Sequence, residues 1–431
     1  MRSIFRKMAC ILVSVILILP LLIYIKLINK KRNVLIWGPI PILNNKYWSA
    51  AMDMAGYNSI TYMSECYSIN KKEDFDKYFF YSGKLGHLMN ALHISNYLAF
   101  CYCVRNCSVI HIPYTGGFLG GTPLERIEAK LLHLANIKIV VLPYGSDFYR
   151  YSRILDKSLT AGLLNSYPEH AKCELAIARR VEYWNRNADF VGCGYQLDGA
   201  GRWDMLAFSF VVVDTDKIFY AKKESFHNGL NGTVRIVHTP NHRGVKGTEF
   251  LIQAVEDLKD EGLDIELVLL EHKTNDKVLE ELRNSDILAE QFILTGYGLS
   301  GIEGMATGIP VLSNLENEEY TRVFRRYSYL NECPIFSTSP ENIKENLRIL
   351  IKHPELRKQL GIAGRKYVEK YHSYMAAKYI FSNVYEKILN GKNIDLMNVF
   401  HPLKSDYVKN NKIIHPLKEN TLPKDYLGDE C

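Results

Sequence analysis

The sequence lacks the glycine patterns and the cysteine framework that would assign it to several common protein classes. Its 28 glycines form no G-x-x-x-x-G-K-[ST] loop, and no G-x-G-x-x-G follows a predicted strand. A Walker A loop and a nicotinamide cofactor are therefore not indicated. The nine cysteines are odd in number and scattered, which argues against disulfides and predicts a reducing compartment. Cys101, Cys103 and Cys107 have no second pair at zinc spacing, so buried free thiols are favoured over a metal site.

Positive charge is in excess only at the N-terminus. The whole chain of 431 residues has 53 basic and 47 acidic residues, but residues 1–32 hold seven of the basic residues and no acidic one. The remainder is close to neutral. General nucleic-acid binding is disfavoured, because it requires a basic surface.

Met8 to Ile25 is an uncharged apolar run of 18 residues, just long enough to span a hydrocarbon core. A cleaved signal peptide is the alternative. The run is followed by 26–32, which is basic and has no small-residue cleavage site, so an uncleaved membrane anchor is favoured. Three basic residues precede the run and four follow it, so the positive-inside rule gives no orientation.

From residue 33 onward, short apolar segments of strand type alternate with helical segments. The predicted strands fall into two series: 33–37, 59–63, 109–112, 138–143, 190–192 and 208–213, then 234–238, 265–270, 309–312 and 334–336. The predicted helices include 88–104, 124–135, 169–186 and the amphipathic 248–260. This alternation is typical of parallel α/β sheets, here two Rossmann-like domains with a ligand cleft at the carboxyl ends of their strands.

The predicted domain organisation has five parts. They are a membrane anchor (1–32), a first Rossmann-like domain (33–216), a second one (217–373), a helix returning to the first domain (374–390) and a loosely ordered tail (391–431). His-Pro-Leu-Lys occurs twice in the tail, at 401–404 and 415–418, which is too few copies for a repeat protein.

A first candidate binding element follows the predicted strand 234–238. The loop carries Arg243, Lys246 and Gly247, and Thr248 is the expected N-cap of the next helix. Backbone N–H groups, the helix dipole and two cations would converge there, which suits a diphosphate. An ordinary loop with solvated Arg and Lys is the alternative.

A second candidate element is the glycine-rich stretch 296–311, in which a turn enters a short helix ending at Gly308. Ser300-x-x-Glu303 has the spacing of a capping box, in which Glu303 serves only the start of the helix. Alternatively, the Glu303 carboxylate faces the cleft and accepts hydrogen bonds from ribose hydroxyls.

In this order, the two elements resemble the second domain of GT-B glycosyltransferases, most of all the retaining enzymes of family 4. The stretch TGYGLSGIEGMATGIPVL (295–312) is similar to that family's E-x7-E element, and 353–373 to its closing helices. The resemblance implies a GT-B fold, in which two Rossmann-like domains face a cleft. It implies that Lys246 and Arg243 contact the donor diphosphate, although the family's arginine usually stands where Asn241 is here.

The same resemblance assigns further donor contacts. Glu303 would bind the nucleotide ribose, and the turn of Tyr297, Gly298 and Leu299 would approach the donor. Thr295 stands where the family's first glutamate helps to hold the donor sugar. This departure indicates an altered donor contact, a divergent subfamily or lost activity.

In the first domain, 143–147 resembles the HGSD turn of these enzymes, with Tyr144 in place of histidine. Asp147 is a candidate catalytic residue that would hold an acceptor hydroxyl; an Asx turn or N-cap is the alternative. His111, at the end of the preceding predicted strand, is the second candidate, with a purely structural histidine as its alternative. Gly38-Pro39 would form the cleft wall facing the acceptor.

Asp214-Thr215-Asp216 is a D-x-D motif, the metal–nucleotide signature of the other glycosyltransferase fold. It falls where the interdomain linker is expected, and the linker interpretation is favoured. No metal or other cofactor is then expected, because Lys246, Arg243 and the helix N-terminus would stabilise charge on the leaving diphosphate.

The sequence thus predicts a membrane-anchored glycosyltransferase with its folded domains in the cytoplasm. It would move a sugar from a nucleotide-diphosphate donor to a hydroxyl of a glycan or lipid-linked acceptor, with retention implied only by the family. A non-catalytic GT-B scaffold or partner subunit is the main alternative, favoured by Thr295, Tyr144 and the spacing of Arg243. An epimerase on the same fold is a third possibility.

Overall fold

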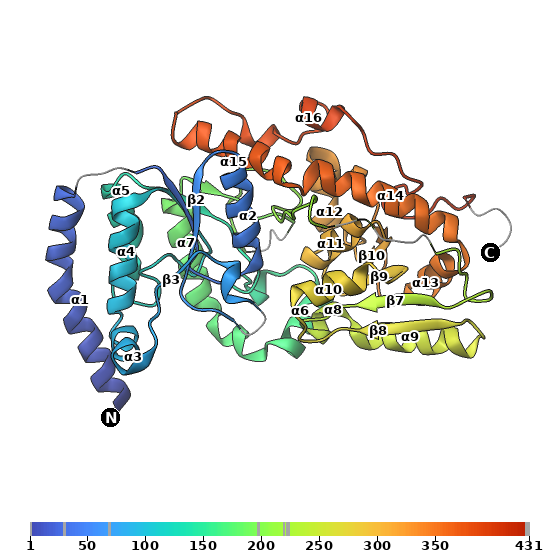
Figure 1. The fold of residues 1–431 in the computed structure, drawn as a ribbon, viewed down its shortest axis with the longest axis horizontal. Coiled ribbons are helices and arrows are strands. Elements are labelled where there is room, and N and C mark those ends of the chain that lie inside the picture. Colours follow the sequence, from blue (N-terminus) through green and yellow to red (C-terminus); the bar gives the residue numbers. More distant parts are fainter. Residues whose placement is uncertain are drawn as a thin grey trace.

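The computed structural model describes residues 2–28, 32–67, 70–195, 199–218, 220 and 225–426. Two α/β domains lie side by side, and the N-terminal helix α1 lies on the outer flank of the first (Figure 1). Each domain is a parallel sheet covered by helices, so the predicted pair of Rossmann-like domains is confirmed.

The first domain is built on a six-stranded parallel sheet of order β3-β2-β1-β4-β5-β6. The chain reverses its winding between β1 and β4, and ligands of such sheets bind beyond the strand ends at this point. The strands are β1 (Val34–Trp37), β2 (Asn58–Met63), β3 (Lys77–Tyr78), β4 (Cys107–Ile112), β5 (Lys138–Val141) and β6 (Phe190–Val191). The helices are α2 (Leu43–Met54), α3 (Gly83–Ala91), α4 (Ile94–Asn106), α5 (Glu128–Leu134), α6 (Lys157–Ser166) and α7 (Glu174–Asn187), with 3-10 turns η1 (Lys72–Asp74), η2 (Glu125–Ile127), η3 (Tyr151–Arg153) and η4 (Pro168–Cys173).

The second domain is built on a five-stranded parallel sheet of order β11-β10-β9-β7-β8. The strands are β7 (Val234–His238), β8 (Ile265–Leu269), β9 (Ile287–Gln291), β10 (Val311–Ser313) and β11 (Phe336–Ser337). The helices are α8 (Arg243–Lys246), α9 (Thr248–Asp260), α10 (Asn275–Leu282), α11 (Leu299–Thr307), α12 (Glu318–Tyr327), α13 (Ile343–Lys352) and α14 (Pro354–Tyr371), with the 3-10 turn η5 (Leu330–Glu332).

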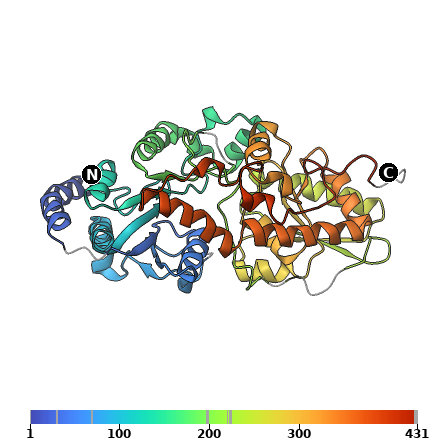
Figure 2. The ribbon, with the colours of Figure 1, turned by 90° about the horizontal axis from the view of Figure 1, so that it is seen from above.

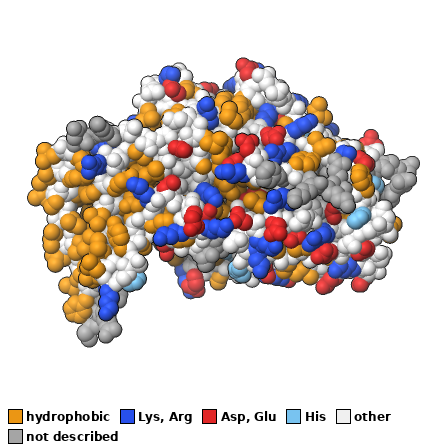
Figure 3. Space-filling model, in the orientation of Figure 1, with side chains coloured by type: hydrophobic (Ala, Val, Ile, Leu, Met, Phe, Trp, Pro, Cys, Tyr) orange, Lys and Arg blue, Asp and Glu red, His pale blue; other side chains and the backbone are white. Residues whose placement is uncertain are grey.

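Helix α1 (Arg2–Leu27) is long and apolar enough over Ile4–Leu27 to cross a membrane, a test that signal sequences and buried helices also pass. One face packs on the first domain, where the Ser14 hydroxyl lies 2.7 Å from the Tyr97 hydroxyl. The opposite face is exposed and apolar, and this flank of the surface is dominated by hydrophobic side chains (Figure 3). Its large exposed residues are Ile4, Phe5, Met8, Ile11, Leu12, Val15, Ile16, Leu19, Ile23 and Leu27.

The chain passes between the domains twice, and the two passages are hydrogen-bonded to each other. The first passage is the extended segment 206–213, and the second follows α14 at His372. Val213 N donates to His372 O at 2.8 Å, and His372 Nδ1 lies 2.8 Å from Val211 O. Helix α15 (Tyr374–Ile388) then returns to the first domain and packs on α2 (Figure 2).

Several local predictions are wrong. The apolar run 208–213 is no strand: it passes between the domains, and its partners are side chains such as Tyr329, whose hydroxyl donates to Ser209 O. The predicted helix 88–104 is two helices, because His93 adopts a left-handed conformation with φ 61°. Thr248 is not the N-cap of α9; Gly247 precedes the helix with φ 72°, and the Thr248 hydroxyl bonds His238 instead.

The part of the tail that the structure describes is ordered, so the predicted loose tail is wrong for 391–426. It contains η6 (Leu396–Asn398) and α16 (Asp406–Lys409). The Tyr407 ring stacks on Tyr379 of α15 with centroids 4.0 Å apart. Further on, Asn420 donates two hydrogen bonds to the backbone carbonyls that precede β11. Hydrogen bonds at many points explain why a segment without periodicity still packs.

The eight described cysteines are free, and Cys103 and Cys107 lie buried where α4 gives way to β4. Within the described ranges, no group of three His, Cys, Asp or Glu side chains is arranged to hold a metal ion. Cys431 lies outside the described residues.

Close packing of α14 on α11 makes Gly361→Ala a sensitive test of the second domain. A Cβ at Gly361 would lie 1.9 Å from the backbone oxygen of Gly308, which cannot swing aside as a side chain would. We expect a loss of roughly 1–3 kcal/mol in the free energy of unfolding, measured by urea denaturation. Gly364→Ala is the control in the same helix, since a Cβ there would lie 3.2 Å from the Cβ and Cγ of Met305, a far less severe approach. Equal stabilities of the two variants would contradict the prediction.

Candidate functional site

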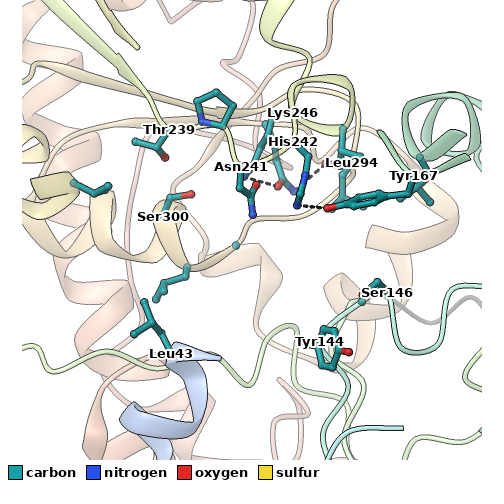
Figure 4. A pocket seen from close by; sticks show the side chains of 18 of the residues that line it. Leu43, Tyr144, Ser146, Tyr167, Thr239, Asn241, His242, Lys246, Leu294 and Ser300 are labelled. Atoms are coloured by element: carbon teal, nitrogen blue, oxygen red, sulfur yellow. Dashed lines mark hydrogen bonds between the residues drawn. The ribbon is translucent and has the colours of Figure 1, made fainter. Parts of the chain in front are cut away.

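A cavity of about 620 Å³ lies between the two domains, at the carboxyl ends of both sheets. Figure 4 shows Tyr144 and Ser146 of the first domain facing Thr239 and Asn241 of the second across this space. The first domain contributes Leu43, Tyr144, Gly145, Ser146, Tyr149, Tyr151, Leu163, Tyr167, His170 and Tyr195. The second contributes Thr239, Pro240, Asn241, His242, Val245, Lys246, Leu270, His272, Lys273, Asn275, Val278, Gln291, Leu294, Gly298, Leu299, Ser300 and Glu303.

Lys246, the last residue of α8, lines this cavity, and its ammonium bonds two side chains at the end of β9. The side chain is only 10% exposed, and Nζ pairs with the fully buried carboxylate of Glu290. It also donates to Gln291 Oε1 at 3.1 Å. An ammonium has three donors, so two are committed to the end of β9 and one is left for a ligand in the cavity.

Glu303 lines the same wall from α11. Asn275 Nδ2 donates to its Oε1 at 2.7 Å, and burial raises the pKa of Glu303 to about 7. The capping-box interpretation is wrong: the N-cap is Gly298, and the Ser300 hydroxyl donates to Glu290 instead. Glu303 therefore keeps one carboxylate oxygen free of protein hydrogen bonds among the described residues, which is what a ribose hydroxyl needs.

The glycine turn before α11 follows strand β9, which the sequence did not predict. G-x-G-x-x-G spacing therefore does follow a strand, at Gly296, Gly298 and Gly301. The expectation that no such spacing follows a strand is wrong. Gly296 has φ 124°, a value that favours glycine. Gly298 and Leu299 line the cavity, whereas the Tyr297 side chain points into the core and lies 2.7 Å from the Tyr367 hydroxyl.

The structure places Arg243 and Thr295 outside the lining of the cavity. Arg243 Nε donates to Glu249 at 2.7 Å, and its Nη1 donates to Glu271 at 3.1 Å. Thr295 is buried and lies 3.4 Å from the amide oxygen of Asn314. Contact of Arg243 with a donor diphosphate stays a prediction and requires these two ion pairs to rearrange.

Asp147 is buried beneath the cavity floor and ties two loops together. Its carboxylate accepts hydrogen bonds from the backbone N–H groups of Tyr114, Tyr144 and Gly145 at 2.9–3.0 Å. Burial raises its pKa to about 6 in spite of these bonds. An Asx turn would bond a backbone N–H two residues after Asp147, whereas Asp147 bonds residues before it, so the Asx-turn alternative is wrong. The carboxylate positions Tyr144 and the loop after β4, and a direct contact of Asp147 with an acceptor stays a prediction.

His111 is enclosed by aromatic side chains at the end of β4. Its ring stacks on Trp37 with centroids 3.5 Å apart, Nε2 lies 2.8 Å from the Tyr385 hydroxyl, and burial lowers its pKa to about 3. It joins α15 to the first sheet and does not line the cavity. Gly38, next to it, has no room for a side chain, because a Cβ would lie 2.2 Å from Tyr62 O.

The D-x-D motif lies in the connection between the domains, as the linker interpretation predicts. Asp214 Oδ1 accepts hydrogen bonds from the backbone N–H groups of Asp216 and Lys217, both at 3.2 Å, and its other oxygen pairs with Lys217 Nζ. The backbone carbonyl of Thr215 accepts a hydrogen bond from Arg365 at 2.7 Å. None of these residues lines the cavity.

Sequence reasoning missed the residues that hold this site in shape. Glu290 anchors Lys246, and Asn275 joins Glu303 to the first domain, since Tyr47 donates to its amide oxygen at 3.2 Å. The Tyr167 hydroxyl bonds His242 where the domains meet (Figure 4). The polar pair at 290–291, directly after an apolar run, was the available signal for β9 and its buried carboxylate.

Comparisons with known proteins show that this chain is similar to glycosyltransferases. The sequence family described as "Glycosyl transferase-like" matches residues 301–377. An uncharacterized glycosyltransferase of Methanocaldococcus jannaschii is 27% identical over 145 residues, which is 29% of this chain. The matched region spans 40% of that relative's length.

Solved structures give the fold. A glycosyltransferase from Rickettsia africae matches with a TM-score of 0.51 at 14% identity, over 84% of this chain and 100% of that one. A sucrose-phosphate synthase from Thermosynechococcus elongatus matches over the same shares with a TM-score of 0.48 at 12% identity. The chain has the GT-B fold of glycosyltransferases, which confirms the predicted fold, while its place in family 4 stays a prediction.

Proposed function

We propose that this protein is a glycosyltransferase whose nucleotide-diphosphate sugar binds the second-domain wall of the interdomain cavity. The observation that carries the proposal is that Lys246, Glu303 and the Gly298–Leu299 turn line one wall of one cavity. A cation suits the diphosphate, a carboxylate with a free oxygen suits the ribose, and backbone at the start of α11 suits phosphate oxygens.

The acceptor would enter from the first-domain wall, which is rich in tyrosine. Tyr144, Tyr149, Tyr151, Tyr167 and Tyr195 all line the cavity, and aromatic faces with hydroxyl edges suit a sugar, which is apolar on its ring faces and polar at its rim. In the retaining chemistry implied by the family resemblance, the acceptor oxygen bonds the anomeric carbon as the bond to the diphosphate breaks. The departing diphosphate oxygen takes the acceptor proton, so no strong protein base is required.

Attachment to a membrane through α1 belongs to the same proposal, with the folded domains on the cytoplasmic side. The exposed apolar face of α1 supports it, and nucleotide sugars made in the cytosol would reach the cavity directly. A glycan or lipid-linked acceptor at the membrane surface is the substrate class that fits this placement.

The test is calorimetric binding of UDP, GDP and ADP to the full chain in detergent. We expect saturable binding of one nucleotide, weakened roughly tenfold or more by Glu303→Ala, because hydrogen bonds to charged groups are the strong ones. Glu182→Ala is the control, since Glu182 is exposed and pairs with Arg186 on α7, outside the cavity. Added EDTA should leave the affinity unchanged, because Lys246 replaces a metal in this proposal.

A folded protein that binds none of these nucleotides would contradict the transferase and favour a non-catalytic scaffold. Thr295, in place of a glutamate that holds the donor sugar in the family it resembles, is the observation that favours this second candidate. Nucleotide release from the donor sugar alone, without acceptor, would instead indicate an epimerase.

A further inference from the structure

A second cavity, of about 470 Å³, lies within the first domain and shares no lining residue with the interdomain cavity. Its walls are the loop after β4, the η2–α5 segment and one face of α7; α5 and α7 are labelled in Figure 1 and contact each other. The lining residues are Thr115, Gly116, Gly120, Glu125, Arg126, Glu128, Ala176, Arg179, Arg180, Tyr183 and Trp184.

Three arginines face this cavity without a counter-ion. Among the described residues, Arg126, Arg179 and Arg180 form no ion pair, and Arg180 Nε is a buried donor with no hydrogen-bond partner. In contrast, Arg186 on the same helix pairs with Glu182 in the usual i, i+4 arrangement. Arg126 and Arg179 are exposed, and Arg180 is half-buried. A buried guanidinium donor without a partner is costly, and guanidinium groups match phosphate oxygens, so this cluster fits an anionic ligand.

Among the described residues, neither glutamate in the wall forms an ion pair with the arginines, and both instead bond the neighbouring loop. Glu128 accepts hydrogen bonds from Gly117 N at 3.2 Å and from Leu119 N at 2.9 Å. Glu125 accepts one from Gly121 N at 3.1 Å. Burial also raises the pKa of Glu128 to about 7, which reduces its negative charge near neutral pH.

The elements that form this cavity also contact α1 on one side and the loop of the interdomain cavity on the other. Helix α5, which begins at Glu128 in the cavity wall, also packs against α1. Thr115 belongs to the loop that Asp147 ties to Tyr144, and Tyr144 lines the interdomain cavity. An anion bound to the arginines would thus lie between the apolar flank and the site of transfer.

We propose that this cavity binds the phosphate or diphosphate group of a lipid-linked acceptor. Arg126, Arg179 and Arg180 pair with its oxygens, since guanidinium groups match phosphate geometry. The half-buried Tyr183 beside them supplies apolar surface for the first units of the lipid chain. The assignment rests on the proposed glycosyltransferase function. The lipid phosphate of an acceptor would bind here, while the hydroxyl that receives the sugar would reach the interdomain cavity.

The experiment measures binding of geranyl diphosphate and of inorganic pyrophosphate to the full chain in detergent by calorimetry. We expect geranyl diphosphate to bind more tightly than pyrophosphate. The double variant R179A/R180A should weaken it by at least about tenfold for each arginine removed, because charge-assisted hydrogen bonds are lost. Arg186→Ala is the matched control on the same helix and should bind like the wild type.

Equal affinity of R179A/R180A and the wild type for geranyl diphosphate would overturn the assignment. Binding that UDP, GDP or ADP displaces, or that Glu303→Ala weakens, would place the diphosphate in the interdomain cavity and also overturn it. Pyrophosphate binding as tight as that of geranyl diphosphate would overturn the lipid-linked source. Arginine-dependent binding in a protein that binds no nucleotide would support the cavity while the transferase proposal fails.

Discussion

Lys246→Ala is expected to lower the free energy of unfolding by about 3–5 kcal/mol, because it leaves a buried carboxylate without its cation. The Glu290 side chain has no exposed surface, and after the substitution its hydrogen-bond donors among the described residues are the hydroxyls of Ser300 and Ser313. These donors carry no charge and cannot replace the ammonium. Urea unfolding followed by far-ultraviolet circular dichroism measures the loss.

Lys217→Ala is the matched control, because Lys217 pairs with Asp214 while being 84% exposed. Exposed pairs contribute about 0–1 kcal/mol. Lys246→Met combined with Glu290→Gln should recover much of the stability, since it removes both charges together. A Lys246→Ala loss no larger than the control would show that Glu290 does not depend on this lysine. Donor binding by Lys246 variants is therefore meaningful only in protein shown to be folded.

Nucleotide affinity is expected to rise about tenfold between pH 6 and pH 8, as Glu303 ionises around its raised pKa of about 7. The ionised carboxylate is the stronger acceptor for ribose hydroxyls. Glu303→Gln keeps the hydrogen bond from Asn275 and should bind more weakly, without this rise. The difference between the two profiles isolates Glu303, because every other group that lines the cavity, and the nucleotide itself, is the same in both experiments. Parallel profiles would contradict the role of Glu303.

The same group predicts an unusual pH dependence of stability. The folded pKa of Glu303 lies above its unfolded value of 4.5, so between pH 4.5 and 7 the native state holds a proton that the unfolded chain releases. Stability from this group is present at low pH and is lost as pH rises through about 7, by up to about 1.4 kcal/mol per pH unit. Between pH 4.5 and 7, the free energy of unfolding of Glu303→Gln should rise relative to that of the wild type. That of Glu249→Gln should show no such trend.

Most of the sheet framework could be predicted from the sequence, because buried parallel strands are nearly continuous apolar runs. Such runs at 109–112 and 234–238 became β4 and β7. Strand β9 could not be found this way, since it ends in Glu290 and Gln291. The run at 208–213 has the composition of a strand but is buried between the domains instead. An apolar composition indicates that a segment is buried, but it does not indicate whether neighbouring strands or the other domain cover it.

The sequence predicts only part of the candidate site, because residues that bond each other there are far apart along the chain. Lys246 and Glu303 are on the cavity wall, where motif spacing put them. Glu290 is 44 residues from Lys246, and His111 meets Tyr385 from the other end of the chain. A charged or polar residue whose partner is so remote looks free in the sequence. The sequence therefore predicts His111 and Asp147 as cleft residues, although in the structure all their polar side-chain atoms have protein partners.

The joined passages at Val213 and His372 restrict how the two domains can move. Two connections bonded at one place form a hinge, which allows the domains to swing apart and resists sliding of one past the other. Opening would break several contacts between the domains, among them Tyr167 with His242, Tyr47 with Asn275, Lys71 with Asp276 and Asn317 with Asp156. Substrate entry and product release would therefore depend on contacts that lie away from the transferred sugar.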